Sequence, residues 1–408
     1  MAASDATVAA SGSAASVATS VKRLAGDAPR RLFAAFIGDE ILQEWGRLPY
    51  AVLHPFLASG FEVQVYDNLR SRLTAFEQCE ERDLPQPAQL TLGMRGVTFT
   101  SQIPDHADEF IYLFDYALDI AKRRPWMRRV HLKYDTFSSY WLRSPLLAPY
   151  AMHPAQTELA TAERIQQLRS MPRTLRSLFA GDSKGYVRRW VRYPEQKLPR
   201  HEVLKVLKDR LGDHLIAVAG ADEIAQLCAA GYVDKFVLSD SGTGITPERW
   251  LPTMALADFF LCPPGIVMPM CHNVIEAMAV GTIPLISYAE WFHPNLRHLH
   301  DCVVYGGPDD LAEKMRLVLA MPQADVARMR ANVIDYYESH LRPEVVVQAI
   351  ESRPEAEVTL LLHTELNMAQ NSARLNGRSV LIKGPDADGP LRWVGRTLDR
   401  YVGRSSGS

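Results

Sequence analysis

Short apolar runs alternate with amphipathic segments along most of the chain, and the alternation is most regular after residue 175. Apolar runs bounded by glycine or proline are typical of strands that are covered on both faces, as in a parallel sheet. The strands predicted in this half are 177–180, 214–219, 235–238, 258–262, 282–287 and 302–305. The helices predicted between them are 202–211, 221–230, 247–256, 270–280 and 310–320. This order predicts a doubly wound α/β domain with helices on both faces of its sheet.

The first half of the chain shows the same order less clearly. The strands predicted there are 32–37, 61–66, 97–100 and 130–134, and the helices are 50–59 and 107–124. Residues 70–105 are interrupted by prolines and are predicted to be mainly loops apart from the strand 97–100. Strands that alternate with helices again favour an α/β domain with a parallel sheet.

The length of 408 residues fits two domains rather than one core. We predict a disordered leader over 1–28, an N-terminal α/β domain over 29–160, a C-terminal Rossmann-like domain over 173–345, and a tail over 346–408. That tail could pack back on the N-terminal domain. A content of 47% hydrophobic and 23% charged residues excludes a disordered chain and a coiled coil, and a net charge of −2 gives no general attraction for nucleic acid.

Targeting signals and cysteines add little. The first twenty residues lack the charged start and apolar centre of a signal peptide, and no apolar run is long enough to span a membrane. The five cysteines form no C-x-x-C pair, so a reducing, cytoplasmic setting is expected. Beyond Pro390, the spacing predicts a helix with an apolar stripe on one side and Arg392, Arg396 and Arg400 on the other. This basic helix could make peripheral contact with an anionic membrane, although a helix docked on the domains with solvated arginines is the favoured alternative.

The candidate chemistry lies between Asp258 and Ser287, which read as a strand, a Pro-Gly loop, a short helix and a second strand. The loop after a parallel strand faces the ligand crevice, and the helix that follows points its N-terminal amides at that crevice. Gly265 allows an anion to approach the backbone closely. Glu276 lies one turn after His272 on the same helix face, where its carboxylate can accept hydrogen bonds from ribose hydroxyls.

The order Phe-Leu-Cys-Pro-x-Gly265, followed by Glu276-Ala-Met-x-x-Gly281-x-Ile-Pro-Leu-Ile286, resembles the nucleotide-sugar-binding domain of GT-B glycosyltransferases. The exostosin-like group is the nearest, and the resemblance covers roughly residues 175–340. It implies two Rossmann-like domains that face each other across a cleft. The nucleoside diphosphate sugar would bind the C-terminal domain and the acceptor the N-terminal domain, with no metal and no cofactor besides the donor substrate.

The resemblance assigns donor-binding residues one by one. Glu276 would bind the donor ribose and Gly265 would line the diphosphate. The turn after strand 177–180 would supply phosphate contacts, although it could equally be a solvated basic loop; its residues are Gly181, Lys184, Arg188 and Arg189. His272 and Asn273 complete the predicted donor set. His272 stands where the group usually has arginine and Met270 where it has serine, which puts the phosphate contacts in question.

Retaining relatives carry a second glutamate where this chain has Met268, so an inverting reaction is favoured. An inverting enzyme needs a general base near the acceptor hydroxyl. We expect this base at a strand end of the N-terminal domain, with Asp39 slightly favoured over Asp135, and with His54 and His293 as further candidates.

The sequence thus predicts a glycosyltransferase that acts on a glycan, lipid-linked or protein acceptor. Two alternatives stay open. One is a nucleotide-sugar epimerase or hydrolase, and the other is a catalytically inactive binding or scaffold protein.

Overall fold

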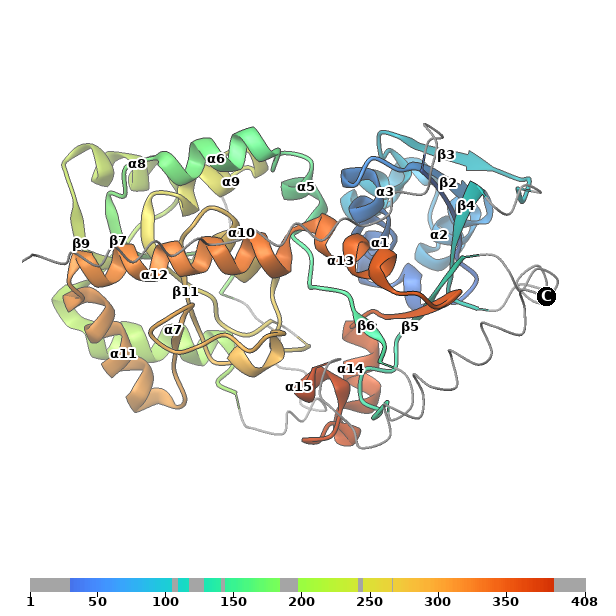
Figure 1. Ribbon diagram of the computed structural model, residues 1–408. Helices are drawn as coiled ribbons and strands as arrows, with labels where there is room; N and C mark the ends of the chain where they lie inside the picture. Colours follow the sequence, from blue (N-terminus) through green and yellow to red (C-terminus); the bar gives the residue numbers. More distant parts are fainter. Residues whose placement is uncertain are drawn as a thin grey trace, which may run out of the picture.

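Two parallel sheets organise the chain, one in each half of the molecule (Figure 1). The computed structural model describes residues 30–104, 109–116, 128–140, 144–183, 197–240, 245–265 and 267–384. Within these ranges the N-terminal sheet has the strand order β3-β2-β1-β4-β5-β13-β6, and the C-terminal sheet has the order β12-β11-β10-β7-β9-β8. The pairings between these strands are parallel. The predicted α/β class with two Rossmann-like domains is confirmed.

The strands follow the apolar runs of the sequence closely. They are β1 (Arg31–Ala35), β2 (Glu62–Tyr66), β3 (Val97–Thr100), β4 (Phe110–Phe114), β5 (Arg129–Lys133), β6 (Leu146–Leu147), β7 (Leu175–Ala180), β8 (Leu215–Ala217), β9 (Val233–Ser239), β10 (Ala257–Leu261), β11 (Ile283–Ile286), β12 (Val303–Val304) and β13 (Glu357–Leu361).

The helices of the described residues connect these strands. They are α1 (Arg47–Ala58), α2 (Asn68–Glu77), α3 (Gln86–Leu92), α5 (Pro154–Thr157), α6 (Ala162–Ser170), α7 (Arg200–Leu211), α8 (Ala221–Ala229), α9 (Pro247–Met254), α10 (His272–Ala279), α11 (Pro308–Ala320), α12 (Gln323–Tyr336), the π-helix η7 (Tyr337–Leu341), α13 (Pro343–Ser352), α14 (Glu365–Asn371) and α15 (Val380–Lys383).

Two predictions in the N-terminal half are wrong. The helix predicted over 107–124 is replaced at Phe110–Phe114 by β4, which pairs with β1 and β5 in the middle of the sheet. A continuous apolar run suits a strand covered on both faces, and this position overrides the helical spacing. Residues 107, 108 and 117–124 of the expected helix lie outside the described ranges. The predicted loops of 70–105 include parts of two helices, α2 and α3. Pro87 lies in the first turn of α3, where a missing backbone N–H costs little.

The chain returns to the N-terminal domain after α12. Helix α13 packs on α1, and β13 inserts between β5 and β6. The Arg128 guanidinium reinforces this return by donating hydrogen bonds to the backbone carbonyls of Ile350 and Glu355. Residues 343–361 are therefore an integral part of the N-terminal domain.

The C-terminal domain has the more thoroughly buried core. All residues of β7 and β10 are buried, and these two strands are neighbours. From β7 the chain winds to β8 and β9 on one side of the sheet, and from β10 to β11 and β12 on the other. Such a switch point opens a crevice beyond the carboxyl ends of the two strands. The candidate site is built there.

In the part of the chain that the structure describes, every helix is too short or too polar to cross a bilayer. The predicted basic helix beyond Pro390 lies outside that part.

Candidate functional site

The loop after β10 and the start of α10 lie at this switch point. An added Cβ at Gly265 would lie 2.8 Å from the carbonyl oxygens of Met268 and Met270, so this loop can close only around glycine. Cys271 occupies the N-cap position of α10, and its side chain makes no hydrogen bond to the first-turn amides. The positive end of the helix dipole therefore lies beside the loop without a capping side chain.

Glu276 is the most enclosed charged group of this site, with 0% of its surface exposed. Its Oε2 accepts a hydrogen bond of 2.7 Å from Trp250 Nε1. Its Oε1 accepts one of 3.1 Å from the backbone N–H of His153 and lies 3.0 Å from His272 Nδ1. His153 belongs to the segment that connects the two domains. This interdomain segment therefore covers the carboxylate that the sequence assigns to the donor ribose.

The charges of this cluster are coupled. Burial raises the pKa of Glu276, but the neighbouring His272 and the hydrogen bonds more than offset it, so that the pKa lies below its ordinary value. Burial lowers the pKa of His272, but the facing Glu276 carboxylate raises it by more, so that the pKa of His272 lies above its ordinary value. Burial and the nearby His272 lower the pKa of His153 to about 4. Glu276 and His272 thus form an ion pair, while His153 stays neutral.

Arg200 was not predicted from the sequence and lies beside the N-cap of α10, at the start of α7. Its Nη1 donates a hydrogen bond of 3.1 Å to the Asp182 carbonyl, and its Nη2 lies 3.7 Å from Cys271 Sγ. Its Nε is buried without a partner among the described residues, and none of their carboxylates forms an ion pair with it. A guanidinium that no carboxylate of the described residues pairs with therefore lies next to the N-cap of α10. The only sequence signal was its place directly after Pro199, at the start of a helix.

The structure brings together most of the predicted donor residues that lie within the described ranges. Gly265, His272, Asn273 and Glu276 share one loop and helix, and Asn273 is buried there. Gly181 follows the neighbouring strand β7 and has a positive φ of +146°. Three predicted phosphate contacts, Lys184, Arg188 and Arg189, lie outside the described residues.

The two predicted bases lie apart from this loop, at strand ends of the N-terminal domain. Asp39 has a side chain that is 76% exposed and pairs with Arg72 at 2.5 Å. Asp135 accepts hydrogen bonds from Ser138 and Arg374. Burial raises the pKa of Asp135, but these bonds more than offset it and keep the carboxylate ionised. Asp135 also lines a cavity of about 500 Å³ at this edge of the sheet.

The two histidine candidates lie in different places. His54 stacks on Tyr50 in α1, with ring centroids 5.7 Å apart, and burial lowers its pKa. His293 follows β11, and its Nε2 lies 2.7 Å from the Leu381 carbonyl of α15.

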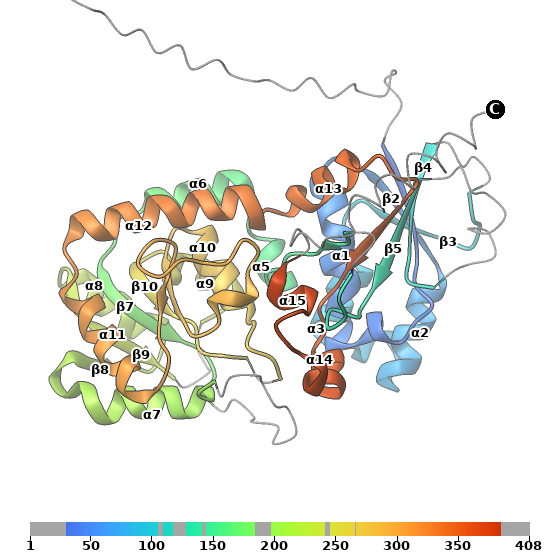
Figure 2. The same ribbon diagram turned by 60° about the horizontal axis from the view of Figure 1, so that its bottom comes forward.

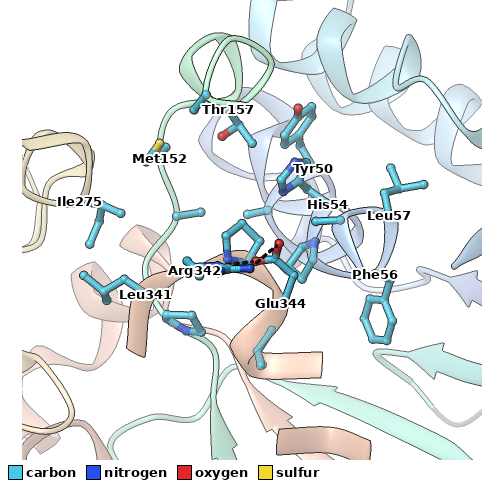
Figure 3. A pocket seen from close by; sticks show the side chains of 18 of the residues that line it. Tyr50, His54, Phe56, Leu57, Met152, Thr157, Ile275, Leu341, Arg342 and Glu344 are labelled. Carbon is cyan, nitrogen blue, oxygen red and sulfur yellow. Dashed lines mark hydrogen bonds and ion pairs between the residues drawn. The ribbon is translucent and has the colours of Figure 1, made fainter. Parts of the chain in front are cut away.

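A cavity of about 690 Å³ lies where the chain crosses between the domains (Figure 3). The first crossing contributes Met152 and Thr157, and the second contributes Leu341 and Arg342. Figure 3 shows Arg342 paired with Glu344 across from His54, and this ion pair measures 3.1 Å. The cavity therefore lies at the two connections between the domains rather than at the strand ends of the C-terminal sheet.

A third cavity, of about 250 Å³, lies between the domains beside the loop that follows β10. Met270 and Trp291 line it from the C-terminal domain, and His363, two residues after the end of β13, lines it from the N-terminal domain. Helices α14 and α15 lie between the domains in Figure 2, and Leu381 of α15 forms part of its wall. Among the described residues, no group of three or more His, Cys, Asp or Glu is placed to hold a metal ion.

No protein-family model matches the chain, and no curated protein matches it in sequence. Solved structures with a similar arrangement include WaaG, a glycosyltransferase involved in lipopolysaccharide biosynthesis, with 13% identity, a TM-score of 0.35, and coverage of 79% of this chain and 100% of WaaG. HepE of Anabaena in complex with UDP has 12% identity and a TM-score of 0.39, with coverage of 79% and 100%. Trehalose-6-phosphate synthase OtsA has 10% identity and a TM-score of 0.40, with coverage of 79% and 99%. Because these TM-scores lie below 0.5, the function has to be argued from the residues of this chain.

Proposed function

We propose that this protein transfers a sugar from a nucleoside diphosphate sugar to an acceptor hydroxyl, with inversion at the anomeric carbon and without a metal ion. The observation that carries the proposal is the pairing of Arg200 with the N-terminus of α10 at the switch point of the C-terminal sheet. A guanidinium and a helix N-terminus are both suited to bind phosphate.

In this proposal the diphosphate binds between Arg200 and the first turn of α10. The leaving group of the reaction is a nucleoside diphosphate, whose negative charge grows as the sugar departs. Donors already in place for that charge stabilise the transition state more than the ground state. Arg200 suits this role because its described contacts are a carbonyl and a thiol, which leave its positive charge uncompensated.

The ribose would reach Glu276 after the interdomain segment releases it. Trp250 and His272 can keep their hydrogen bonds to the carboxylate, while the His153 amide gives way to a ribose hydroxyl. An exchange of one donor for another preserves the hydrogen-bond count of a buried charge, so that its cost is small.

Of the two predicted bases, Asp135 is the better placed, because it lines a cavity and stays ionised, whereas Asp39 is mostly exposed and paired. In the proposed step the acceptor hydroxyl gives its proton to Asp135 and its oxygen bonds to the anomeric carbon. The bond between that carbon and the diphosphate oxygen breaks, and the electron pair leaves with the nucleoside diphosphate.

The test is calorimetry with a panel of nucleoside diphosphates on the wild type and on Arg200→Ala. The variant should bind at least about tenfold more weakly, as expected for the loss of a charge-assisted hydrogen bond of about 1.5–3 kcal/mol. Arg210→Ala is the matched control, because Arg210 lies on the same helix and pairs with the exposed Asp309. Its affinity should equal that of the wild type.

The other results separate the alternatives. Equal affinity of both variants would contradict the assigned phosphate site. If the wild type binds no nucleoside diphosphate, a non-catalytic binding or scaffold role replaces the proposal. If it hydrolyses a nucleotide sugar in the presence of a chelator but transfers to no acceptor, a hydrolase is the better description.

A further inference from the structure

The cavity of about 250 Å³ between the domains has mostly apolar and aromatic walls. The Tyr, Trp, Phe and Met side chains in its lining are Tyr150, Met152, Met270, Trp291 and Phe292. The polar side chains of the lining are few, and most are occupied. Arg47 pairs with Glu44 and hydrogen-bonds to Tyr150, and the His293 ring contacts a backbone carbonyl.

His363 differs from these groups. Only 7% of its surface is exposed, and its Nδ1 lies 3.0 Å from Thr136 Oγ1. Its Nε2 is buried and has no hydrogen-bond partner among the described residues. An unpaired buried nitrogen costs about 1–3 kcal/mol, so that a partner is expected. The ring also lies edge-on to Trp291, with centroids 5.5 Å apart and an interplanar angle of 71°, which holds it at the cavity wall.

We propose that this cavity binds a single sugar ring and that a hydroxyl of that sugar forms a hydrogen bond with His363 Nε2. The choice of a sugar rests on the proposed function. Apolar walls with few polar atoms are typical of small-molecule sites, and 250 Å³ lies below the range of about 300–1,000 Å³ for larger ligands. The cavity is therefore sized for one ring and not for a whole nucleotide sugar.

The position of the cavity agrees with a sugar-binding site close to the proposed diphosphate site. Met270, in its lining, directly precedes the N-cap of α10, where the diphosphate is proposed to bind. On the opposite side, the partner of His363 is Thr136, the next residue after Asp135. The sugar would thus lie between the loop after β10 in one domain and His363 in the other, while Asp135 lines the separate cavity of about 500 Å³.

His363 is suited to binding rather than to proton transfer. Burial lowers its pKa to about 3, so that the ring stays neutral across the physiological range. A neutral imidazole offers Nε2 as a hydrogen-bonding atom without the cost of a buried charge. His363 is therefore a substrate-binding residue in this proposal, with Thr136 positioning its ring.

The experiment compares the full-length wild type with His363→Ala and His363→Gln. Affinities are measured for nucleoside diphosphates, for the corresponding nucleotide sugars, and for a panel of methyl glycosides added with the nucleoside diphosphate. His363→Ala should leave the nucleoside diphosphate affinity unchanged and weaken sugar binding about three- to tenfold, as for one lost hydrogen bond. His363→Gln should restore most of the loss, because its amide can replace Nε2.

The measurements with nucleotide sugars and with methyl glycosides show whether the cavity binds the donor sugar or the acceptor sugar. A loss confined to nucleotide sugars assigns the cavity to the donor sugar, and a loss confined to methyl glycosides assigns it to the acceptor. Equal sugar affinities of the wild type and His363→Ala overturn the proposal, even if nucleoside diphosphates bind. If no nucleoside diphosphate binds, this result contradicts the proposed function but not the proposal for the cavity. The glycosides alone then test the cavity, through a shift of the His363 ring-nitrogen resonances, and unchanged resonances overturn it.

Discussion

At the residue scale, the ion pair between His272 and Glu276 makes stability depend on pH. The raised pKa of His272 gives stability that is complete below its ordinary value of 6.5 and is lost as the pH rises through the folded value. The lowered pKa of Glu276 gives stability that is complete above its ordinary value of 4.5 and is lost as the pH falls through the folded value. The pair therefore stabilises the fold most between these two ordinary values.

His272→Gln tests this dependence. The difference in the free energy of unfolding between wild type and variant should reach about 1–3 kcal/mol in that pH window and shrink on both sides of it. Urea unfolding across the pH range measures the difference. His201→Gln is the control, because His201 is half-exposed and lies 3.9 Å from its acidic neighbour. A pH-independent difference for His272→Gln would contradict the ion pair.

At the element scale, β13 connects the far end of the chain to the N-terminal sheet. Leu360 of β13 is 2% exposed and packs in the N-terminal core, between the pairings with β5 and β6. Leu360→Ala should lower the free energy of unfolding by about 2–5 kcal/mol, because it leaves a cavity in this core.

Leu366→Ala is the matched control for that change. Leu366 lies six residues later in α14 and is 36% exposed, so that its truncation should cost little. Urea unfolding followed by circular dichroism measures both variants. Equal losses would mean that β13 is not part of the cooperative N-terminal unit.

At the scale of the whole molecule, the interdomain segment covers Glu276. The backbone N–H of His153 donates a hydrogen bond to the Glu276 carboxylate. The backbone angles of His153 are φ −60° and ψ 138°. Proline adopts these angles and has no N–H, so that His153→Pro removes this contact with little change of backbone shape. The variant should bind nucleoside diphosphates up to about tenfold more tightly, because a ribose hydroxyl no longer competes with the amide.

His153→Ala is the control for that change, since it removes the ring and its cap to Ala155 but keeps the backbone amide. Calorimetry should give it the affinity of the wild type. If His153→Pro and His153→Ala bind equally, the segment does not restrict access to the carboxylate.

The local pattern of the sequence was sufficient for the C-terminal sheet and for part of the site. The runs at β7, β10 and β11 became fully buried strands, because a strand covered on both faces needs no polar positions. Gly265, His272 and Glu276 were predicted together because they lie within one loop and one helix, where spacing along the chain determines distance in space. The same local reasoning failed at Phe110–Phe114, where a central place in the sheet outweighed helical periodicity.

What the sequence determined by itself is therefore the α/β class and the grouping of the donor-loop residues, which depend on neighbouring positions. Only the tertiary structure decided the contacts between distant segments. It covered Glu276 with His153, 123 residues away, and brought Arg200 to Cys271 across 71 residues. It also inserted β13 beside β5 and so placed His363 against Thr136, 227 residues apart. Such contacts arise from how sheets and domains pack, and spacing along the chain carries no information about them.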